Sequence, residues 1–593
     1  MTLICVPIMV QDVHAAIADA VAARDLSADL VEFRLDDFFT GASGADGERE
    51  VAEVVRLVRE SPLPCIVTCR PAIGGEGGRY DGDEAARISL FERLGTSDHP
   101  PRYLDVELAT YGRSANVKQK INLAVQHEAQ VRDLHTSLIL SAHDFEGRPH
   151  DLMRKLSAMH AEPAAAVLKI AYHARSLRDN LELFDVLRES DRPTIALGMG
   201  EFGLMSRVLA PKFGGFLTFA SLRPASTTAP GQPTVRELVD SFRFRTINAR
   251  SRVLGVIGYP VGHSLSPAIH NAGFESIGDA GWAERDGDGH AIAGTHAGGV
   301  YLPLPIPPEY EHFKATLGAM LDHPTLAFAG CSVTIPHKEH LLRFAREDLA
   351  RGRAGDNSPH PPHPPHSPHW HIDATASDAG AANTLAVRRD ALGRVSFCFV
   401  GNTDGEAAVK ALQAHLPDLA GSTIGILGAG GAARSIASEL LRAGASVVIF
   451  NRTLPRAEAL ANDFNAGAAG RMQPALLSAV ADHPCDALIN CTPVGMTGGP
   501  APGESPVEAS VLRACGEGAK ARGHTLAVMD TVYSPLETPL LQLTRELGLI
   551  SIDGLQMFVR QAAGQFHAWT GHAAPAALFD RVARETLESR EGK

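Results

Sequence analysis

Short apolar runs alternate with longer amphipathic segments over the first 220 or so residues. Eight runs have the length and content of buried strands: LICVPIMV, LVEFRL, PCIVTC, RYLDVEL, SLILSAH, AVLKIAYH, PTIALGM and FLTFAS. Segments of helical length separate most of them. Eight such units in about 240 residues predict a (β/α)8 barrel of the TIM type, with one large open parallel sheet as the alternative.

The pattern changes near residue 245 and again near residue 415. The eighth run is followed by a turn-rich stretch, ASTTAPGQPT, and by a segment predicted to be helical, VRELVDSFRFRTIN. Strands and helices then alternate again, and a strand–turn–helix unit, STIGILGAGGAARSIASELLRAG, starts a further α/β piece. We therefore expect three domains, over 1–245, 250–410 and 415–555, with C-terminal helices over 556–593 that pack back on the second.

Composition and charge narrow the class of protein. The 593 residues include 55 basic and 68 acidic side chains, a formal net charge of -13, and 45% are apolar. This acidic balance argues against binding to nucleic acid or to an acidic membrane. We find no apolar run of ~18 residues. The start, MTLICVPIMV, lacks the features of a targeting peptide, and the eight cysteines form no CxxC pair. We expect a cytoplasmic protein that acts on small molecules.

Two biased segments interrupt the second half. One is Gly-rich, GDAGWAERDGDGHAIAGTHAGG, and the other is Pro/His-rich, DNSPHPPHPPHSPHWH. In the latter His360, His363, His366 and His369 are three residues apart, the repeat of a polyproline II helix, so they can share one edge. That edge could bind a metal; the alternative, which we adopt, is a solvated surface insertion without a metal.

Polar residues within or after the barrel strands are candidates for chemistry, because active sites of such barrels lie at the carboxyl ends of the strands. Lys169 lies inside an apolar run, where burial without a partner favours the neutral, nucleophilic amine. A salt-bridged lysine is the alternative. His143 follows the fifth run and suits acid–base work near neutral pH. The remaining candidates are Glu32, Arg34, Arg70, Arg207 and Gln232. Several guanidiniums around an amine suit an anionic ketone.

Ordered blocks across this domain resemble type I 3-dehydroquinate dehydratase: EFRLD, CRP…EGGRYDGDE, YLDVEL, SAHDFE, LKIAYHARSLRDN, MGEFGLMSR and APGQ. The resemblance implies dehydration of 3-dehydroquinate to 3-dehydroshikimate through an imine on Lys169. It implies that His143 moves the protons and that Glu76 assists it. The substrate would be bound by Glu32, Arg34, Arg70, Met199, Arg207, Thr228 and Gln232. The segment PAIGG before Glu76 is two residues longer than is usual in that family, and Thr228 stands where a serine is common.

A glycine-rich turn marks the second half. Gly428, Ala429, Gly430, Gly431, Ala432 and Ala433 form a GxGxxA pattern between a strand and a helix. That context is typical of dinucleotide binding, with a simple glycine-rich turn as the alternative. The next strand ends in Asn451, Arg452 and Thr453, where an NAD site usually has an acid. An arginine accommodates a 2′-phosphate and favours NADP, unless it is only a surface residue.

Lys338 and Asp404 are candidates for an acid–base pair, which hydride transfer to a ketone needs for the alkoxide proton. The blocks around them resemble shikimate dehydrogenase: GYPVGHSLSPAIHN, GCSVTIPHKEH, GAANTL, GNTDG, GAGGAARS, NRT, NCTPVGM, DTVYSPLETPLL and GLQMFVRQAAGQF. The resemblance implies a catalytic Lys338–Asp404 pair, a substrate-binding domain over 250–410 and a Rossmann NADP domain over 415–555. Substrate contacts would come from Ser264, Ser266, Thr334, Asn383, Tyr533 and Gln561. The nicotinamide side would be lined by Thr492, Val494, Gly554 and Met557.

The two resemblances together predict a fusion of two consecutive enzymes, as in plants, in which NADPH reduces the product of the first domain to shikimate. We expect a monomer or homodimer with two separate sites open to solvent. Three alternatives stay open: only the dehydrogenase half is active, it prefers quinate and NAD, or the chain is a non-catalytic sensor of metabolites. Retention of Lys169, His143, Lys338 and Asp404 argues against the sensor.

Overall fold

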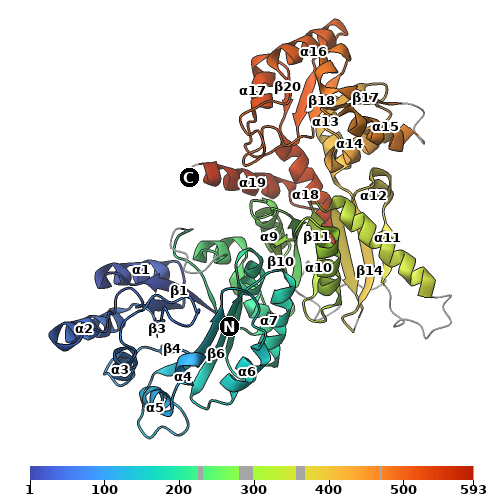
Figure 1. Cartoon of the computed structure of the whole chain (residues 1–593). Coiled ribbons are helices and arrows are strands. Elements are labelled where there is room, and N and C mark those ends of the chain that lie inside the picture. Colours follow the sequence, from blue (N-terminus) through green and yellow to red (C-terminus); the bar gives the residue numbers. More distant parts are fainter. Residues whose placement is uncertain (225–230, 279–297, 356–367, 391, 466–470, 592–593) are drawn as a thin grey trace. The chain divides into compact units, whose positions relative to one another are not determined.

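The computed structural model describes residues 1–593 apart from 225–230, 279–297, 356–367, 391, 466–470 and 592–593 (Figure 1). By its internal contacts the chain divides into two compact units, Met1–Ser251 and Arg252–Lys593. Thr228, His360, His363 and His366 lie outside the described residues.

Eight parallel strands form the sheet of the first unit. They are β1 (Leu3–Met9), β2 (Leu30–Arg34), β3 (Cys65–Thr68), β4 (Tyr103–Glu107), β5 (Ser137–Asp144), β6 (Ala165–His173), β7 (Thr194–Met199) and β8 (Leu217–Phe219). Their order is β7-β6-β5-β4-β3-β2-β1-β8, so β8 pairs with β1. The N–H of Phe216, just before β8, donates to the carbonyl of Thr194 in β7 at 2.8 Å. The sheet therefore nearly closes on itself, which confirms the barrel and excludes the open sheet.

Helices cover the outside of this barrel (Figure 1). They are α1 (Val13–Asp25), α2 (Gly44–Glu60), α3 (Glu84–Gly95), α4 (Leu108–Tyr111), α5 (Ala115–Ala124), α6 (Leu152–His160), α7 (Arg178–Glu189) and α8 (Leu204–Val208). Several begin at a side-chain cap; the carboxylate of Asp12, for example, accepts a hydrogen bond from the N–H of Ala15. The strands read as continuous apolar runs because both of their faces are buried.

The segment after β8 differs from the prediction. The helix expected over VRELVDSFRFRTIN is replaced by a π-helical turn, Glu237–Ser241, and a 3-10 turn, Phe244–Thr246. Arg243 lies between them with a φ of 53°. A left-handed residue cannot continue a right-handed helix, so the predicted helix is wrong there.

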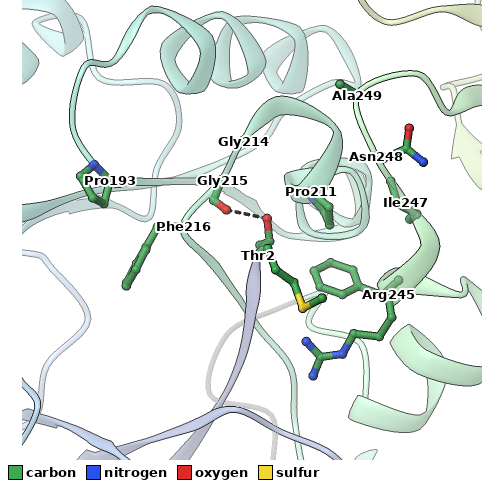
Figure 2. Close-up of a pocket in the computed structure, with 12 residues that line it drawn as sticks. Thr2, Pro193, Pro211, Gly214, Gly215, Phe216, Arg245, Ile247, Asn248 and Ala249 are labelled. Atoms are coloured by element: carbon green, nitrogen blue, oxygen red, sulfur yellow. Dashed lines mark hydrogen bonds between the residues drawn. The ribbon is translucent and has the colours of Figure 1, made fainter.

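A cavity of about 450 Å³ opens at the amino ends of the barrel strands (Figure 2). Its lining includes Thr2 before β1, Pro193 before β7 and Phe216 before β8. The hydroxyl of Thr2 donates to the carbonyl of Gly215 across its edge. This end is opposite to the carboxyl ends of the strands, where the candidate catalytic residues lie.

The second unit contains two sheets. The first has the order β10-β9-β11-β13-β14-β12, with β13 antiparallel to β11 and β14. Its strands are β9 (Arg252–Gly258), β10 (Gly299–Pro305), β11 (Phe328–Val333), β12 (His369–Ile372), β13 (Thr384–Arg389) and β14 (Val395–Gly401). The helices in this stretch are α9 (Ser266–Ile277), α10 (Tyr310–Asp322), α11 (Lys338–Gly355), α12 (Ala374–Ala379) and α13 (Asp404–Gln413).

The second sheet of this unit is entirely parallel, with the order β17-β16-β15-β18-β19-β20. Its strands are β15 (Thr423–Leu427), β16 (Ser446–Asn451), β17 (Met472–Leu476), β18 (Ala487–Asn490), β19 (Ala527–Asp530) and β20 (Ile550–Ile552). The order reverses beside β15, as in Rossmann-type folds, and ligands bind at such a switch point. The following helices are α14 (Gly431–Arg442), α15 (Leu454–Asn465), α16 (Ala509–Ala521), α17 (Pro539–Glu546), α18 (Gly554–Thr570) and α19 (Ala576–Glu591).

The last two helices return to the first sheet of the unit. Phe566 of α18 and Phe579 of α19 belong to one buried cluster with Leu254 of β9 and Ile269 of α9. Their aromatic rings meet edge to face, with centroids 5.6 Å apart. No helix in the described part of the chain is long and apolar enough to cross a bilayer.

Candidate active sites

Lys169 lies in the barrel interior between two carboxylates. Its Nζ donates to Oδ2 of Asp105 at 2.7 Å and is 3.6 Å from Oε1 of Glu32. The nitrogen also lies 4.6 Å from the centroid of the Phe219 ring. Of the two expectations for Lys169, a buried lysine without a partner is wrong. The alternative, a salt-bridged lysine, is confirmed. An ion pair does not exclude nucleophilic chemistry, but the amine must then lose its proton inside the site.

Asp105 is a residue of the barrel site that sequence reasoning missed. Its Oδ1 accepts from the hydroxyl of Ser141 at 2.6 Å and from Nη2 of Arg70 at 3.0 Å. Burial alone would raise the pKa of Asp105, yet the neighbouring Lys169 and Arg70 cations outweigh it and lower that pKa. A signal was available, since an acid inside the apolar run RYLDVEL is as costly as the lysine inside its own run.

His143 and Glu76 meet at the carboxyl end of β5. One carboxylate oxygen of Glu76, Oε2, is 3.3 Å from both the backbone N and Nδ1 of His143. Nη1 of Arg70 lies against both ring nitrogens, 2.9 Å from Nε2. Burial first, and then the positive charge of Arg70, lower the pKa of His143, so its imidazole is neutral and able to accept a proton. Burial raises the pKa of Glu76 to about 7.

The segment between Arg70 and Glu76 brings Glu76 to His143. Gly74, Gly75 and Gly77 have φ values of 116°, 74° and 72°, which non-glycine residues rarely adopt. A Cβ at Gly77 would lie 2.3 Å from the Phe145 ring. The chain turns tightly at these glycines, and Glu76 and His143 line a cavity of about 700 Å³.

Arg207, in α8, is 2% exposed, and burial lowers its pKa to about 10. Its Nε has no hydrogen-bond partner among the described residues. A buried guanidinium nitrogen without a partner fits an incoming carboxylate.

The other substrate residues predicted for the barrel occupy its strands and mouth. Oε1 of Glu32 accepts from the hydroxyl of Thr68 at 2.7 Å. Arg34 forms a fork with Asp36, with Nη2 2.6 Å from Oδ2. Met199 and Gln232 are buried, and Met199 ends β7.

In the second unit, Lys338 and Asp404 are in contact although 66 residues separate them. Each is the first residue of its helix, α11 and α13. Nζ of Lys338 donates to Oδ2 of Asp404, and Nδ2 of Asn383 donates to Oδ1 at 2.8 Å. The carboxylate therefore holds the ammonium on one oxygen and the amide on the other.

The glycine-rich turn lies beside this pair. A Cβ at Gly431 would be 3.8 Å from Cδ of Lys338, and a Cβ at Gly430 would have no atom within 4 Å. Gly428 has a φ of 103° and its N–H donates to the carbonyl of Phe450 at 2.7 Å. The first residue of α14 is Gly431, so a helix amino end faces this open turn. A helix amino end beside an open glycine-rich turn fits the pyrophosphate of a dinucleotide. Residues 451–453, at the end of the next strand, fit the 2′-phosphate of NADP.

Residues 451–453, at the end of β16, include no acid. Asn451 ends the strand, and its Nδ2 donates to the carbonyl of Thr453 at 2.9 Å. The side chains of Arg452 and Thr453 are exposed. A cationic, solvent-facing side chain at this point suits the 2′-phosphate that distinguishes NADP from NAD.

The remaining predicted residues of the cofactor site are close to the turn or support it. A Cβ at Gly428 would lie 3.0 Å from Cγ2 of Thr492, whose hydroxyl accepts from the N–H of Val494 at 3.3 Å. A Cβ at Gly554 would be 2.4 Å from the carbonyl oxygen of Val532, so a larger residue does not fit. Met557 packs into the core of the second sheet.

The predicted substrate residues come from several elements. The hydroxyl of Ser264 accepts from the N–H of Ser266, the first residue of α9, at 3.2 Å. The N–H of Thr334 donates to the carbonyl of Ile257, and the Tyr533 ring lies 4.6 Å from that of Phe558. The side chain of Gln561, in α18, is partly exposed.

Gln565 was not among the predictions, although it follows Gln561 by one helical turn. Its Nε2 donates to the carbonyl of Asn383 at 3.1 Å. Its buried Oε1 has no hydrogen-bond partner in the described part of the structure.

The Pro/His-rich tract leaves His369 among the described residues. It begins the edge strand β12, and its ring stacks on that of Phe397 with centroids 5.7 Å apart. Within the described ranges, no three His, Cys, Asp or Glu side chains are grouped to hold a metal ion.

Comparison with known families agrees with this division. Residues 4–249 match the family described as type I 3-dehydroquinase. Residues 410–492 match shikimate/quinate 5-dehydrogenase, and residues 554–584 match the shikimate 5′-dehydrogenase C-terminal domain. Fold and site thus define a class of protein in which a dehydroquinase barrel precedes a shikimate dehydrogenase.

One relative spans both parts. The chloroplastic bifunctional 3-dehydroquinate dehydratase/shikimate dehydrogenase of Arabidopsis thaliana is 32% identical, over 98% of this chain and 84% of the relative. This chain belongs to the family of bifunctional 3-dehydroquinate dehydratase/shikimate dehydrogenases. A shikimate dehydrogenase (NADP(+)) of Acidiphilium cryptum is 38% identical, over 58% of this chain and 99% of the relative. A structure of the Thermus thermophilus shikimate 5-dehydrogenase, in complex with NADP(H) and shikimate, is 28% identical, covers 57% and 100% of the two chains and has a TM-score of 0.41.

Proposed function

We propose that this chain catalyses two consecutive reactions with the residues described above. The first unit dehydrates 3-dehydroquinate to 3-dehydroshikimate, and the second reduces 3-dehydroshikimate to shikimate with NADPH. The observation that carries the proposal is that one chain holds a set of candidate catalytic residues for each of the two steps. In the barrel, Arg70 contacts both His143, which meets Glu76, and Asp105, which binds Lys169. In the second unit, Lys338 and Asp404 meet beside the dinucleotide turn. The product of the first step is the substrate of the second.

In the barrel, Lys169 attacks the ketone of the substrate and forms an imine with loss of water. The imine withdraws electrons from the adjacent carbon, so a proton there becomes acidic enough for the neutral His143 to remove. The same imidazole, now protonated, donates to the departing hydroxyl. Glu76 orients the His143 ring through its carboxylate, and Arg207 binds the substrate carboxylate. Hydrolysis of the imine releases the enone and restores Lys169.

The other predicted residues of the barrel serve the same substrate. Glu32, Arg34, Arg70, Thr228 and Gln232 bind its hydroxyls or carboxylate, and Met199 packs over the imine.

In the second unit, bound NADPH supplies the hydride. Lys338 gives a proton to the alkoxide oxygen that develops on the substrate, and Asp404 holds the lysine ammonium in place. Asn383 fixes the other oxygen of Asp404, so the pair has one orientation.

The remaining predicted residues bind the substrate or the cofactor. Ser264 and Ser266 bind the substrate carboxylate, while Thr334, Tyr533 and Gln561 contact its polar groups. Residues 428–433 and 451–453 bind the dinucleotide, and its nicotinamide end is lined by Thr492, Val494, Gly554 and Met557.

We further propose that the second unit is two domains, a substrate-binding part over 250–410 with the helices of 556–593, and an NADP domain over 415–555. The chain acts on small molecules in the cytoplasm as a monomer or homodimer. Light scattering on the purified chain decides the oligomeric state, and microscopy of the tagged chain in its own cells decides the location.

A one-pot assay tests the proposed function. Purified chain is given 3-dehydroquinate without NADPH, and the absorbance of the enone is followed; NADPH is then added and its oxidation recorded. The expected result is that the enone appears and then falls as NADPH is consumed. If added 3-dehydroshikimate is reduced but 3-dehydroquinate gives no enone, only the dehydrogenase half is active. If neither step occurs in folded protein, the chain is a metabolite sensor.

A further inference from the structure

The Lys169 nitrogen carries one positive charge both before and after the imine forms. An ammonium and a ketone give an iminium and water: the N–C bond forms, the C–O bond breaks, and the oxygen leaves with two of the three protons of the nitrogen. One N–H remains, and no proton is gained or lost overall. A group that neutralises the ammonium can therefore neutralise the iminium from the same position. This reasoning rests on the proposed function, in which Lys169 forms the imine.

Two carboxylates are near this nitrogen, and they differ in their distance from it and in their other hydrogen-bond partners. Oε1 of Glu32 is 3.6 Å from Nζ and already accepts from Thr68. Oδ2 of Asp105 is 2.7 Å from Nζ. The other oxygen of Asp105 is fixed by Ser141 at 2.6 Å and by Arg70 at 3.0 Å. Asp105 is thus the closer carboxylate, and hydrogen bonds to its other oxygen fix its orientation.

The position of Asp105 suits an iminium that has a single N–H. Asp105 is fully buried on β4, and its ladder neighbour β5 carries Ser141, which pairs in register with Lys169 on β6. Backbone hydrogen bonds of three adjacent strands therefore fix the carboxylate and the lysine relative to each other. The Phe219 ring, 4.6 Å away, gives the cation a second favourable contact.

We propose that Asp105 is the counter-ion of the Lys169 iminium: it accepts the one remaining N–H, stabilises the positive charge of the iminium and so favours its formation, and sets the direction in which the imine points. A charged hydrogen bond of this kind contributes enough that its loss lowers a rate roughly 10–100-fold. The neighbouring Lys169 and Arg70 cations lower the pKa of Asp105, which favours its ionised form before the substrate binds.

The test compares the full-length chain with Asp105→Asn, which keeps the shape and removes the charge, and with Ser141→Ala, which removes a neutral partner of Asp105. Each protein is incubated with 3-dehydroshikimate without NADPH and reduced with cyanoborohydride, and the fraction of Lys169 carrying the adduct is measured by peptide mass spectrometry. Enone formation from 3-dehydroquinate gives kcat and KM. Near-ultraviolet circular dichroism checks the barrel fold, and NADPH-dependent reduction of 3-dehydroshikimate checks the second unit.

We expect Asp105→Asn to lower both the trapped fraction and kcat roughly 10–100-fold, with a smaller change in KM, and Ser141→Ala to remain within about 10-fold of the wild type. In the wild type the trapped fraction should not change systematically with pH, because the imine forms without net proton uptake. Folded Asp105→Asn with a wild-type trapped fraction overturns the proposal. The proposal is also overturned if the trapped fraction of wild-type Lys169 rises about tenfold for each unit by which the pH is lowered, because imine formation would then take up a proton. This measurement on the wild type tests the proposal even if Asp105→Asn does not fold. A wild type that is never labelled at Lys169 instead refutes the imine of the proposed function.

Discussion

Glu76→Gln tests whether the charge of this carboxylate is what orients His143. The substitution keeps the size of the side chain and an oxygen that can accept hydrogen bonds, but it removes the ionisation. In the wild type, Oε2 of Glu76 is 3.3 Å from both Nδ1 and the backbone N of His143. Only the ionised carboxylate stabilises a positive imidazolium while that ring carries the substrate proton.

The size of the effect follows from the pKa of Glu76, which burial raises to about 7. Such a group is about 3% ionised at pH 5.5 and about 90% ionised at pH 8. The ratio of the wild-type dehydration rate to that of Glu76→Gln should therefore be roughly 30-fold larger at pH 8 than at pH 5.5. The variant should lack the rise in rate that the wild type shows as pH passes through 7.

Stability should change with pH in the opposite sense. Because the folded protein raises the pKa of Glu76 from 4.5 to about 7, the contribution of this group is fully present below pH 4.5 and is lost as pH rises through 7. The loss is on the order of 3 kcal/mol. A glutamine is never ionised, so Glu76→Gln should match the wild type at pH 4.5 and resist denaturant better at pH 8.

The assay is the initial rate of enone formation by the full-length chain and by Glu76→Gln at half-unit steps between pH 5.5 and 8.5. NADPH-dependent reduction of 3-dehydroshikimate on the same samples corrects for the amount of active protein. A rate ratio that stays constant across this range would refute the reasoning, because it would show that the Glu76 charge is irrelevant to His143.

Three further substitutions separate the two sites. Lys169→Ala should abolish dehydration, at least 1000-fold by order of magnitude, and leave NADPH-dependent reduction intact; simultaneous loss of both activities would contradict two independent sites. Asp404→Asn should lower kcat for reduction roughly 100-fold, because it frees Lys338, with dehydration unchanged; a wild-type kcat would remove Asp404 from the catalytic pair. Arg452→Ala should raise KM for NADPH about 10-fold or more and that for NADH little, whereas equal effects on both would exclude a contact to the 2′-phosphate.

Local patterns in the sequence were enough to predict the architecture. Eight apolar runs with helical segments between them specify a barrel, because each strand is buried on both faces and must be covered by helices. The Gly428–Ala433 turn is recognisable for a similar reason, since the geometry it needs is formed by consecutive residues. The local pattern failed at Arg243, where the left-handed backbone conformation of one residue interrupts the predicted helix.

The residue types needed for chemistry could also be found in the sequence, but their partners could not. Lys169 was singled out because a lysine in a buried strand is costly, yet the sequence left open whether it was salt-bridged. Asp105 was not singled out, although it is hydrogen-bonded to Lys169. The two residues are 64 positions apart in the sequence, so no local pattern connects them. Glu76 and His143 are 67 residues apart, and Lys338 and Asp404 are 66 apart.

Sequence by itself therefore determined the order of the elements, the class of each domain and the residues able to do chemistry. The tertiary structure alone decided which of them meet: Asp105 with Lys169, Glu76 with His143, and Lys338 with Asp404. The physical reason is that periodicity and turn chemistry act over a few neighbouring residues. Contacts across 60 or more residues depend instead on strand order, on register and on where each loop returns, and these are set by the packing of the whole unit.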